Sequence, residues 1–147
     1  MRTLIALREL SGCTLPDRAE AWRSWHTEEQ RWWDEQGQAT LDRLSSEDDG
    51  EVVAAIRAAS ERSLQRDQIA VRMAVLLRKH ASPSVRRQVC MALERLDSRA
   101  VLGTLGLALE DADADVRSSA HRALHSITGL SLPLDRLAWY EALHSSR

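Results

Sequence analysis

The most informative feature of this 147-residue chain is its shortage of aromatic and turn-forming residues. It contains no Phe, a single Tyr, six Gly and three Pro. Sheets draw on aromatic and β-branched residues, whereas the residues that are abundant here, Ala, Leu, Arg and Glu, favour helices. We therefore expect an all-α protein, and the length suits a single domain over residues 1–147.

Cysteine pairs and long apolar runs are also missing. Cys13 and Cys90 have no CxxC or CxxxH spacing, so neither a disulfide framework nor a structural zinc site is indicated. Only four apolar residues separate Thr3 from Arg8, too few for a signal peptide, and no run approaches the length of a membrane span. These absences predict a cytoplasmic protein without membrane contact, and no motif indicates a cofactor.

The charges are nearly balanced overall but unevenly distributed. A net charge of −2 argues against a dedicated nucleic-acid-binding protein. Acidic residues outnumber basic ones by 11 to 6 in residues 1–50, whereas basic residues outnumber acidic ones by 9 to 5 in residues 51–97. Residues 98–147 contain 6 acidic and 5 basic residues. The basic middle segment keeps nucleic-acid binding as an alternative, but its acidic flanks disfavour it.

What the sequence does contain is internal repetition. Residues 82–97 match residues 113–128 at a shift of 31. The identical pairs are Val85/Val116, Arg86/Arg117, Ala92/Ala123 and Leu93/Leu124. Repeats of this length are typical of stacked helical solenoids.

A second match has a longer spacing. At a shift of 117, Leu4–Trp22 falls on His121–Trp139 with seven identities in nineteen positions. Roughly one identity would arise by chance between unrelated segments, so this match also indicates true repetition. We expect the chain to begin and end in the same structural element, with Trp139 equivalent to Trp22.

Apolar residues at helical spacing divide the chain into helix pairs. Gln68–Lys79 and Arg99–Glu110 are expected to be first helices, each followed by a second helix that begins near Pro83 or Asp113. An earlier pair is expected at Glu28–Leu44 and Gly50–Arg62, the former opened by a capping box, Thr27-Glu28-Glu29-Gln30. Further helices are expected at Leu4–Leu10 and, after a turn at Pro133, at Asp135–His144.

These patterns resemble HEAT repeats of the short bacterial kind, whose second helix opens with Asp-x-x-Val-Arg, here Asp113–Arg117. The resemblance implies an α-α superhelix of about three helix pairs, in which the second helices line a concave, protein-binding face. Two clear repeats cover residues 67–129, and a divergent repeat covers residues 28–66. Residues 1–27 form an N-terminal half-repeat with a Trp-rich extension, and residues 130–147 form a C-terminal extension.

Equivalent residues of stacked repeats lie in columns, which predicts a partner-binding surface along the second helices. The candidate residues there are Arg57, Arg86, Arg87, Cys90, Arg117 and His121. Arginines in such a groove would hold an acidic or phosphorylated peptide through bidentate contacts. The alternative is structural: Arg86 and Arg117 would bridge to turn carboxylates such as Asp113 and Asp115.

Catalytic and metal sites are not indicated. His121 and His125 have the i, i+4 spacing of two zinc ligands, but HExxH is absent and no third ligand is evident. Cys90 does not lie at a helix start, where a thiol would become reactive.

Four tryptophans crowd into twelve residues: Trp22, Trp25, Trp32 and Trp33. They are expected to close an open end of the solenoid, or alternatively to form an exposed binding patch. Because adjacent Trp32 and Trp33 cannot face the same core, at least one should be partly exposed, and both are candidate binding residues. The apolar face of Leu4–Leu10 would be covered by these rings, or by a second copy in self-association through the N-terminal face.

Together these features predict a non-enzymatic scaffold or assembly subunit. It would bind a protein partner through the concave second-helix face, the Trp-rich end, or both. The alternatives are a nucleic-acid-binding HEAT-like protein and a HEAT-type accessory enzyme similar to the bilin lyases.

Overall fold

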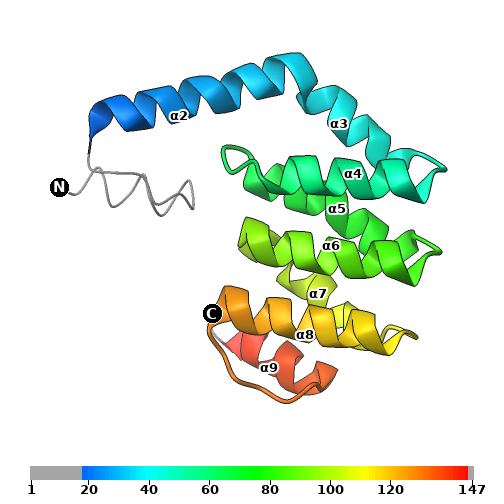
Figure 1. Cartoon of the computed structure of the whole chain (residues 1–147). Coiled ribbons are helices and arrows are strands. Elements are labelled where there is room, and N and C mark those ends of the chain that lie inside the picture. Colours follow the sequence, from blue (N-terminus) through cyan, green and yellow to red (C-terminus); the bar gives the residue numbers. More distant parts are fainter. Residues whose placement is uncertain (1–17, 146–147) are drawn as a thin grey trace.

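The computed structural model describes residues 18–145, and every regular element in this range is helical (Figure 1). In chain order the elements are α2 (Ala19–Trp32), the π-helical turn η1 (Trp33–Gly37), α3 (Gln38–Asp42), the 3₁₀ turn η2 (Arg43–Ser45), α4 (Asp49–Ser60), α5 (Arg66–Lys79), α6 (Pro83–Leu96), the 3₁₀ turn η3 (Arg99–Val101), α7 (Leu102–Ala108), α8 (Ala114–Thr128) and α9 (Arg136–Ser145). The expected helix Leu4–Leu10 and Cys13 lie outside the described residues.

The helices stack in two layers. Helices α4, α6 and α8 lie one above another as the second helices of successive pairs, and α5 and α7 lie behind them as first helices (Figure 1). Helix α6, in the middle, packs against α4, α5 and α8, while α9 packs on α7 below them. The all-α superhelix of helix pairs is therefore confirmed.

Local chemistry explains where α6 and α8 begin and end. Pro83 occupies the first turn of α6, and the Asp113 carboxylate accepts hydrogen bonds from the backbone N–H groups at the start of α8, including that of Val116 at 3.0 Å. The left-handed residues Asp97 (φ 51°) and Gly129 (φ 73°) end these helices. The predicted starts near Pro83 and Asp113 are confirmed.

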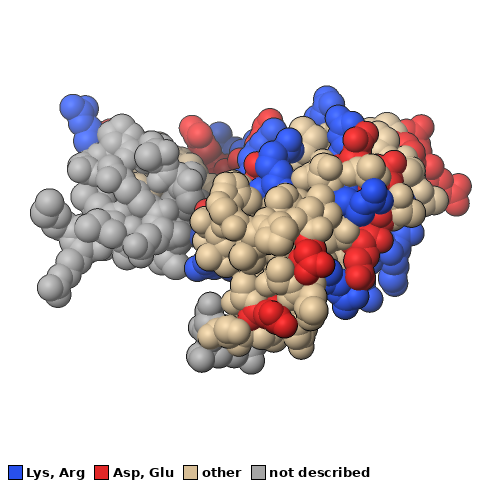
Figure 2. Space-filling model, turned by 90° about the horizontal axis from the view of Figure 1, so that it is seen from below, with Lys and Arg blue, Asp and Glu red and all other residues tan. Residues whose placement is uncertain are grey.

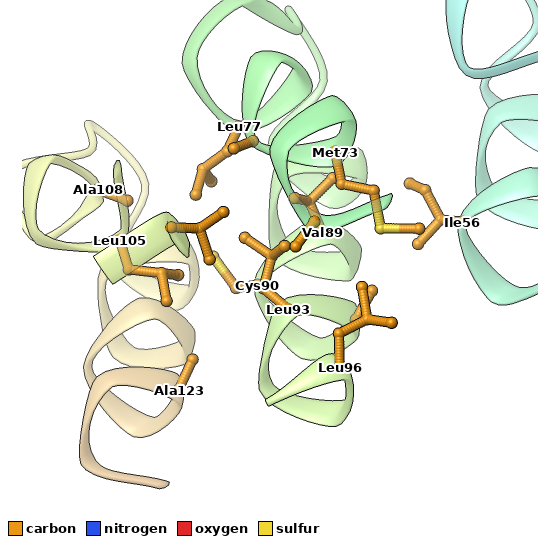
Figure 3. Packing of buried hydrophobic residues seen from close by; sticks show 14 of the residues in the cluster. Ile56, Met73, Leu77, Val89, Cys90, Leu93, Leu96, Leu105, Ala108 and Ala123 are labelled. Atoms are coloured by element: carbon orange, nitrogen blue, oxygen red, sulfur yellow. The ribbon is translucent and has the colours of Figure 1, made fainter. Parts of the chain in front are cut away.

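The residues repeated at a spacing of 31 form the core. Leu93, Leu124 and Ala123 are fully buried, and Val85, Val116 and Ala92 are at most 4% exposed. Figure 3 shows Leu93 and Ala123 in this core. Small side chains at the alanine positions allow the second helices to stack, and the branched residues fill the space between layers. The apolar stripes predicted from the repeats are thus the core of the stack.

The helix start predicted at Thr27 is wrong. Helix α2 begins eight residues earlier, at Ala19, and the Thr27 hydroxyl donates a hydrogen bond to the carbonyl of Arg23 at 2.9 Å instead of capping a helix. A capping box acts only where the preceding backbone is not helical, and here Ala19–His26 is already helical. The division placed between residues 27 and 28 therefore falls inside α2.

A π-helical turn joins α2 to α3, where the helical rod changes direction in Figure 1. The indole of Trp33 lies against the backbone of Gly37, and a Cβ added at Gly37 would come 2.3 Å from Trp33 Cε3. Only glycine leaves room for this ring, which explains a glycine inside a helical segment.

The start of α9 supports the 117-residue match. Helix α9 begins at Arg136 and α2 at Ala19, which are 117 residues apart, and the equivalent Trp139 and Trp22 are both buried. Trp139 Nε1 donates to the carbonyl of Pro133 at 3.0 Å, which fixes the ring below α8. Trp139 thus covers this end of the stack, as expected for a terminal aromatic residue.

Candidate partner-binding surface

A groove opens between the second helices α4 and α6, with a volume of about 400 Å³. Ile56 and Ala92 form its buried floor, and Met91 is exposed at its edge. We call this feature the second-helix groove; its lining residues are Ile56, Arg57, Ser60, Glu61, Gln88, Met91, Ala92 and Arg95. It combines an apolar floor with charged rims.

Two guanidinium groups in the second-helix groove lack an acidic partner. Arg57 is exposed and its side chain has no polar contact within residues 18–145, whereas Arg95 makes one hydrogen bond, from Nη1 to the hydroxyl of Ser60 at 3.2 Å. Glu61 contributes one carboxylate to the same lining. Of the predicted binding residues, Arg57 therefore lies where sequence reasoning placed it, on an open surface.

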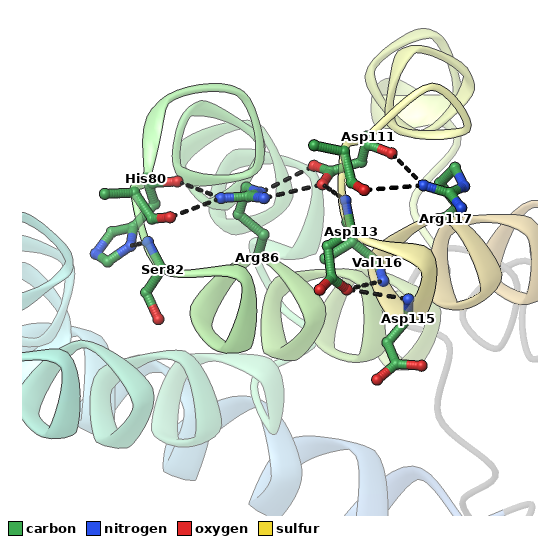
Figure 4. A network of polar contacts seen from close by, with 10 residues as sticks. His80, Ser82, Arg86, Asp111, Asp113, Asp115, Val116 and Arg117 are labelled. Atoms are coloured by element: carbon green, nitrogen blue, oxygen red, sulfur yellow. Dashed lines mark hydrogen bonds and ion pairs between the residues drawn. The ribbon is translucent and has the colours of Figure 1, made fainter.

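Arg86 is instead part of an inter-repeat ladder (Figure 4). Its Nε and Nη2 donate to the two oxygens of Asp111 at 2.8 and 2.9 Å, and its Nη1 donates to the carbonyls of His80 and Ala81. The side chains of Arg86 and Asp111 are only 14% and 10% exposed. Hydrogen bonding from Arg86 lowers the pKa of the Asp111 carboxyl, and the same bond raises the pKa of Arg86.

Arg117 repeats this arrangement one unit later. Its Nη1 donates to the carbonyls of Asp111 and Ala112 at 2.7 and 3.1 Å, which are the positions 31 residues after His80 and Ala81. Both arginines therefore hold the turn before their own helix, and Arg86 also bridges to the next repeat. The structural alternative fits them, although the bridging carboxylate is Asp111 and not Asp113 or Asp115.

Arg87 remains available at the surface. Its side chain is half exposed, and its Nη1 lies 3.9 Å from a carboxylate oxygen of Asp115, which is itself largely exposed. An exposed ion pair at this distance contributes little to stability, so a partner's acidic group can compete for Arg87 at small cost.

The placement of Cys90 on the solvent flank of α6 is wrong. Its side chain is fully buried, and it lies among the core residues between α6 and the α7–α8 pair (Figure 3). Burial raises the pKa of the thiol to about 12. Helix α6 is covered on two sides by α4 and α8, and its residues in the second-helix groove are Gln88, Met91 and Arg95, one position along from the predicted column.

A known family model matches the stacked part of the chain. Residues 69–138 match the family model described as HEAT repeats, a segment that runs from α5 into the start of α9. This segment is therefore similar to HEAT repeats. The match leaves out α2, α3 and α4. Neither the curated proteins nor the solved structures yielded a significant match.

His121 lies under the extended segment that follows α8. Its Nε2 is 2.7 Å from the carbonyl oxygen of Leu132, and its ring meets Trp139 edge to face at 5.9 Å. His125 binds the same extension, with Nδ1 2.7 Å from the carbonyl oxygen of Leu130. Both imidazoles therefore hold the tail against α8, and His121 does not open onto the second-helix groove.

Trp32 and Trp33 lie at the opposite end of the stack, before α3 and α4. Trp32 is buried, and Trp33 is partly exposed, as predicted for one member of this pair. Their rings meet edge to face at 5.2 Å, and the guanidinium carbon of Arg62 lies 5.0 Å from the Trp32 ring centroid. The two tryptophans therefore close this end of the stack and do not form an exposed binding patch.

Sequence reasoning missed the role of Glu29. Its buried carboxylate accepts hydrogen bonds from the backbone N–H groups of Ser63 and Leu64 at 3.1 and 3.2 Å, and lies 3.5 Å from Nη1 of Arg62. It thereby fixes α2 to the turn between α4 and α5. The signal was available, because Glu29 shares a helix face with Trp32, where an apolar residue would otherwise be expected.

Residues 18–145 contain neither a membrane-spanning helix nor a metal-binding cluster. None of their helices combines the length and apolar character needed to cross a membrane. Nor do three His, Cys, Asp or Glu side chains in this part of the chain come together in a group that could hold a metal ion.

Proposed function

We propose that this protein is a non-enzymatic interaction module or assembly subunit that binds a protein partner through the second-helix groove. The observation that carries the proposal is the pair Arg57 and Arg95, two guanidinium groups without an acidic partner beside exposed Met91. Arg and Met are enriched at interfaces, where arginine binds carboxylate or phosphate and methionine adapts to apolar surfaces.

The distribution of ionisable groups supports a binding role over a catalytic one. The pKa shifts of Arg86, Asp111 and Cys90 arise from the ladder or from burial in the core, and none of these groups opens into the second-helix groove. Catalytic groups, by contrast, combine shifted pKa values with access to a cleft.

The surface beside the second-helix groove also carries charged side chains. Arg122 of α8 pairs with Glu94 of α6 at 3.0 Å, and Arg87 makes only its loose contact with Asp115. Charges of both signs alternate here, which suits the surface of a protein partner better than a polyanionic nucleic acid. The free Cys90 thiol and the lack of paired cysteine motifs fit a reducing cytoplasm, which we propose as the compartment.

Charge reversal tests the groove. The double variant Arg57→Glu/Arg95→Glu should lower the affinity for a partner isolated with the parent protein by at least about tenfold, because it replaces both anchoring cations with anions. The matched control Arg72→Glu/Arg78→Glu changes two exposed arginines of α5 and the same net charge, and should bind within about twofold of the parent. Calorimetric titration measures all three affinities.

Thermal melts of both double variants verify that they fold. A parent protein that retains no partner from its native cells would contradict the interaction role. A groove variant that binds as tightly as the control would contradict the location.

A further inference from the structure

The outward face of α9 carries an apolar patch at the end of the stack. Leu137 and Tyr140, one helical turn apart, are 63% and 56% exposed, and Leu134 just before the helix is 44% exposed. Trp139, on the opposite side of α9, is fully buried. Seen from below, this end of the molecule has a largely uncharged centre with few acidic residues (Figure 2).

A recess lies beside this face, between α7 and α9. It has a volume of about 330 Å³, with Leu107, Tyr140 and Leu143 in its lining. Gly103 and Gly106 of α7 line it, and a Cβ added at either would meet nothing within 4 Å, so the space beside them is open. An apolar side chain from outside the chain therefore has a place to insert next to Tyr140.

The charges on α9 are arranged symmetrically about this patch. Arg136 precedes Leu137, and Glu141 follows Tyr140. Both charged residues are exposed; Arg136 forms an exposed ion pair with Glu110 at 2.6 Å, and the Glu141 carboxylate has no polar contact in the described part of the chain. A positive and a negative group thus flank two apolar side chains along one helix.

This pattern is complementary to itself. If two α9 helices run antiparallel about a midpoint between residues 138 and 139, Leu137 of one copy lies opposite Tyr140 of the other. In the same register Arg136 lies opposite Glu141, twice, because a two-fold axis repeats every contact. A different protein could bind this patch without Arg136 and Glu141 in this order, whereas the pairing of two copies requires both charges.

We propose that two copies of this chain pair tail to tail through α9, about a two-fold axis. Each copy contributes Leu137 and Tyr140 to the centre of the contact, and the Arg136–Glu141 pairs set the antiparallel register. Helix α9 has ten residues and is about 15 Å long, so the interface is small and the affinity lies in the micromolar range.

Sedimentation equilibrium of the full chain from low to several hundred micromolar tests the proposal. The mass should rise from 16.5 kDa towards twice that value as concentration increases. Leu137→Asp should weaken association by at least about tenfold, because it places two carboxylates at the centre of the contact. Val75→Asp, at an exposed apolar position of α5, should associate like the parent.

A charge cycle tests the register. Arg136→Glu and Glu141→Arg should each weaken self-association, since each places like charges opposite one another twice. An equimolar mixture of the two variants should regain association, because the mixed dimer has opposite charges at both contacts. This readout does not depend on the Arg136–Glu110 pair, which is absent from the Arg136→Glu chain and intact in the Glu141→Arg chain whether the variants are separate or mixed.

Three results would overturn the proposal. A parent that remains monomeric throughout would leave the α9 face to a different protein. A Leu137→Asp variant that still dimerises would place the interface elsewhere, and a mixture that stays monomeric would exclude the antiparallel register.

Discussion

Replacing Ala123 with Glu should unfold the protein. Ala123 is fully buried in α8, facing Leu105 in the core, and a carboxylate there would have neither water nor a cation (Figure 3). An unpaired buried charge costs several kcal/mol, against a total stability of about 5–15 kcal/mol. Ala92→Glu, one repeat earlier and 4% exposed, should have the same effect.

Thermal unfolding followed by circular dichroism measures this effect. Ser126→Glu, at an exposed position of the same helix, is the control and should melt close to the parent. An Ala123→Glu variant that melts within a few degrees of the parent would show that the repeated stripe is not the core.

Removing Arg86 should have the second largest effect. Arg86→Ala leaves the Asp111 carboxylate without its two charge-assisted hydrogen bonds and the carbonyls of His80 and Ala81 without a side-chain donor. Removing one partner of a buried ion pair costs about 3–5 kcal/mol, and we expect the lower end because both side chains retain some exposure.

Comparing the urea unfolding of Arg86→Ala with that of Arg87→Ala measures what the inter-repeat ladder contributes to the free energy of unfolding. The two variants remove the same side chain from adjacent residues, but Arg87 has only a loose, exposed contact with Asp115. Arg87→Ala should therefore change the free energy of unfolding by less than about 1 kcal/mol. Equal losses in the two variants would contradict a structural role specific to Arg86.

The cost of losing Arg86 should also depend on pH. The pKa of Asp111 is lowered below its ordinary value of 3.8 in the folded protein, chiefly by hydrogen bonding to Arg86. Its stabilising contribution is therefore present above that ordinary value and lost as the pH falls through the lower, folded value. The difference in unfolding free energy between parent and Arg86→Ala should be complete near about pH 7 and should shrink as the pH falls below the ordinary value of 3.8.

The repeated residues made much of the fold predictable. Ala92 and Ala123, or Leu93 and Leu124, recur at the same spacing because each fills the same place between stacked helices, and repetition exposes that constraint directly. The inter-repeat ladder was predicted as an alternative for the same reason, since Arg86 and Arg117 each follow a turn whose carbonyls accept hydrogen bonds from the guanidinium group.

The predictions were wrong where tertiary contacts overrode a local sequence pattern. Thr27–Gln30 has the sequence of a capping box, yet the helix-forming residues before it extend α2 back to Ala19. Cys90 was placed on the surface because one face of α6 was treated as core, whereas packing against both α4 and α8 buries a wider arc. Glu29 binds a turn more than thirty residues away, a contact that no local spacing encodes.

Photo-crosslinking from the second-helix groove tests the proposed function most directly. A photo-reactive amino acid at Met91, at the edge of this groove, should form a covalent adduct with the protein partner in native cells. The same residue at Val75, which is more exposed than Met91 but lies on the first-helix layer, should form none. Adducts from position 75 with none from position 91 would contradict binding through the second-helix groove.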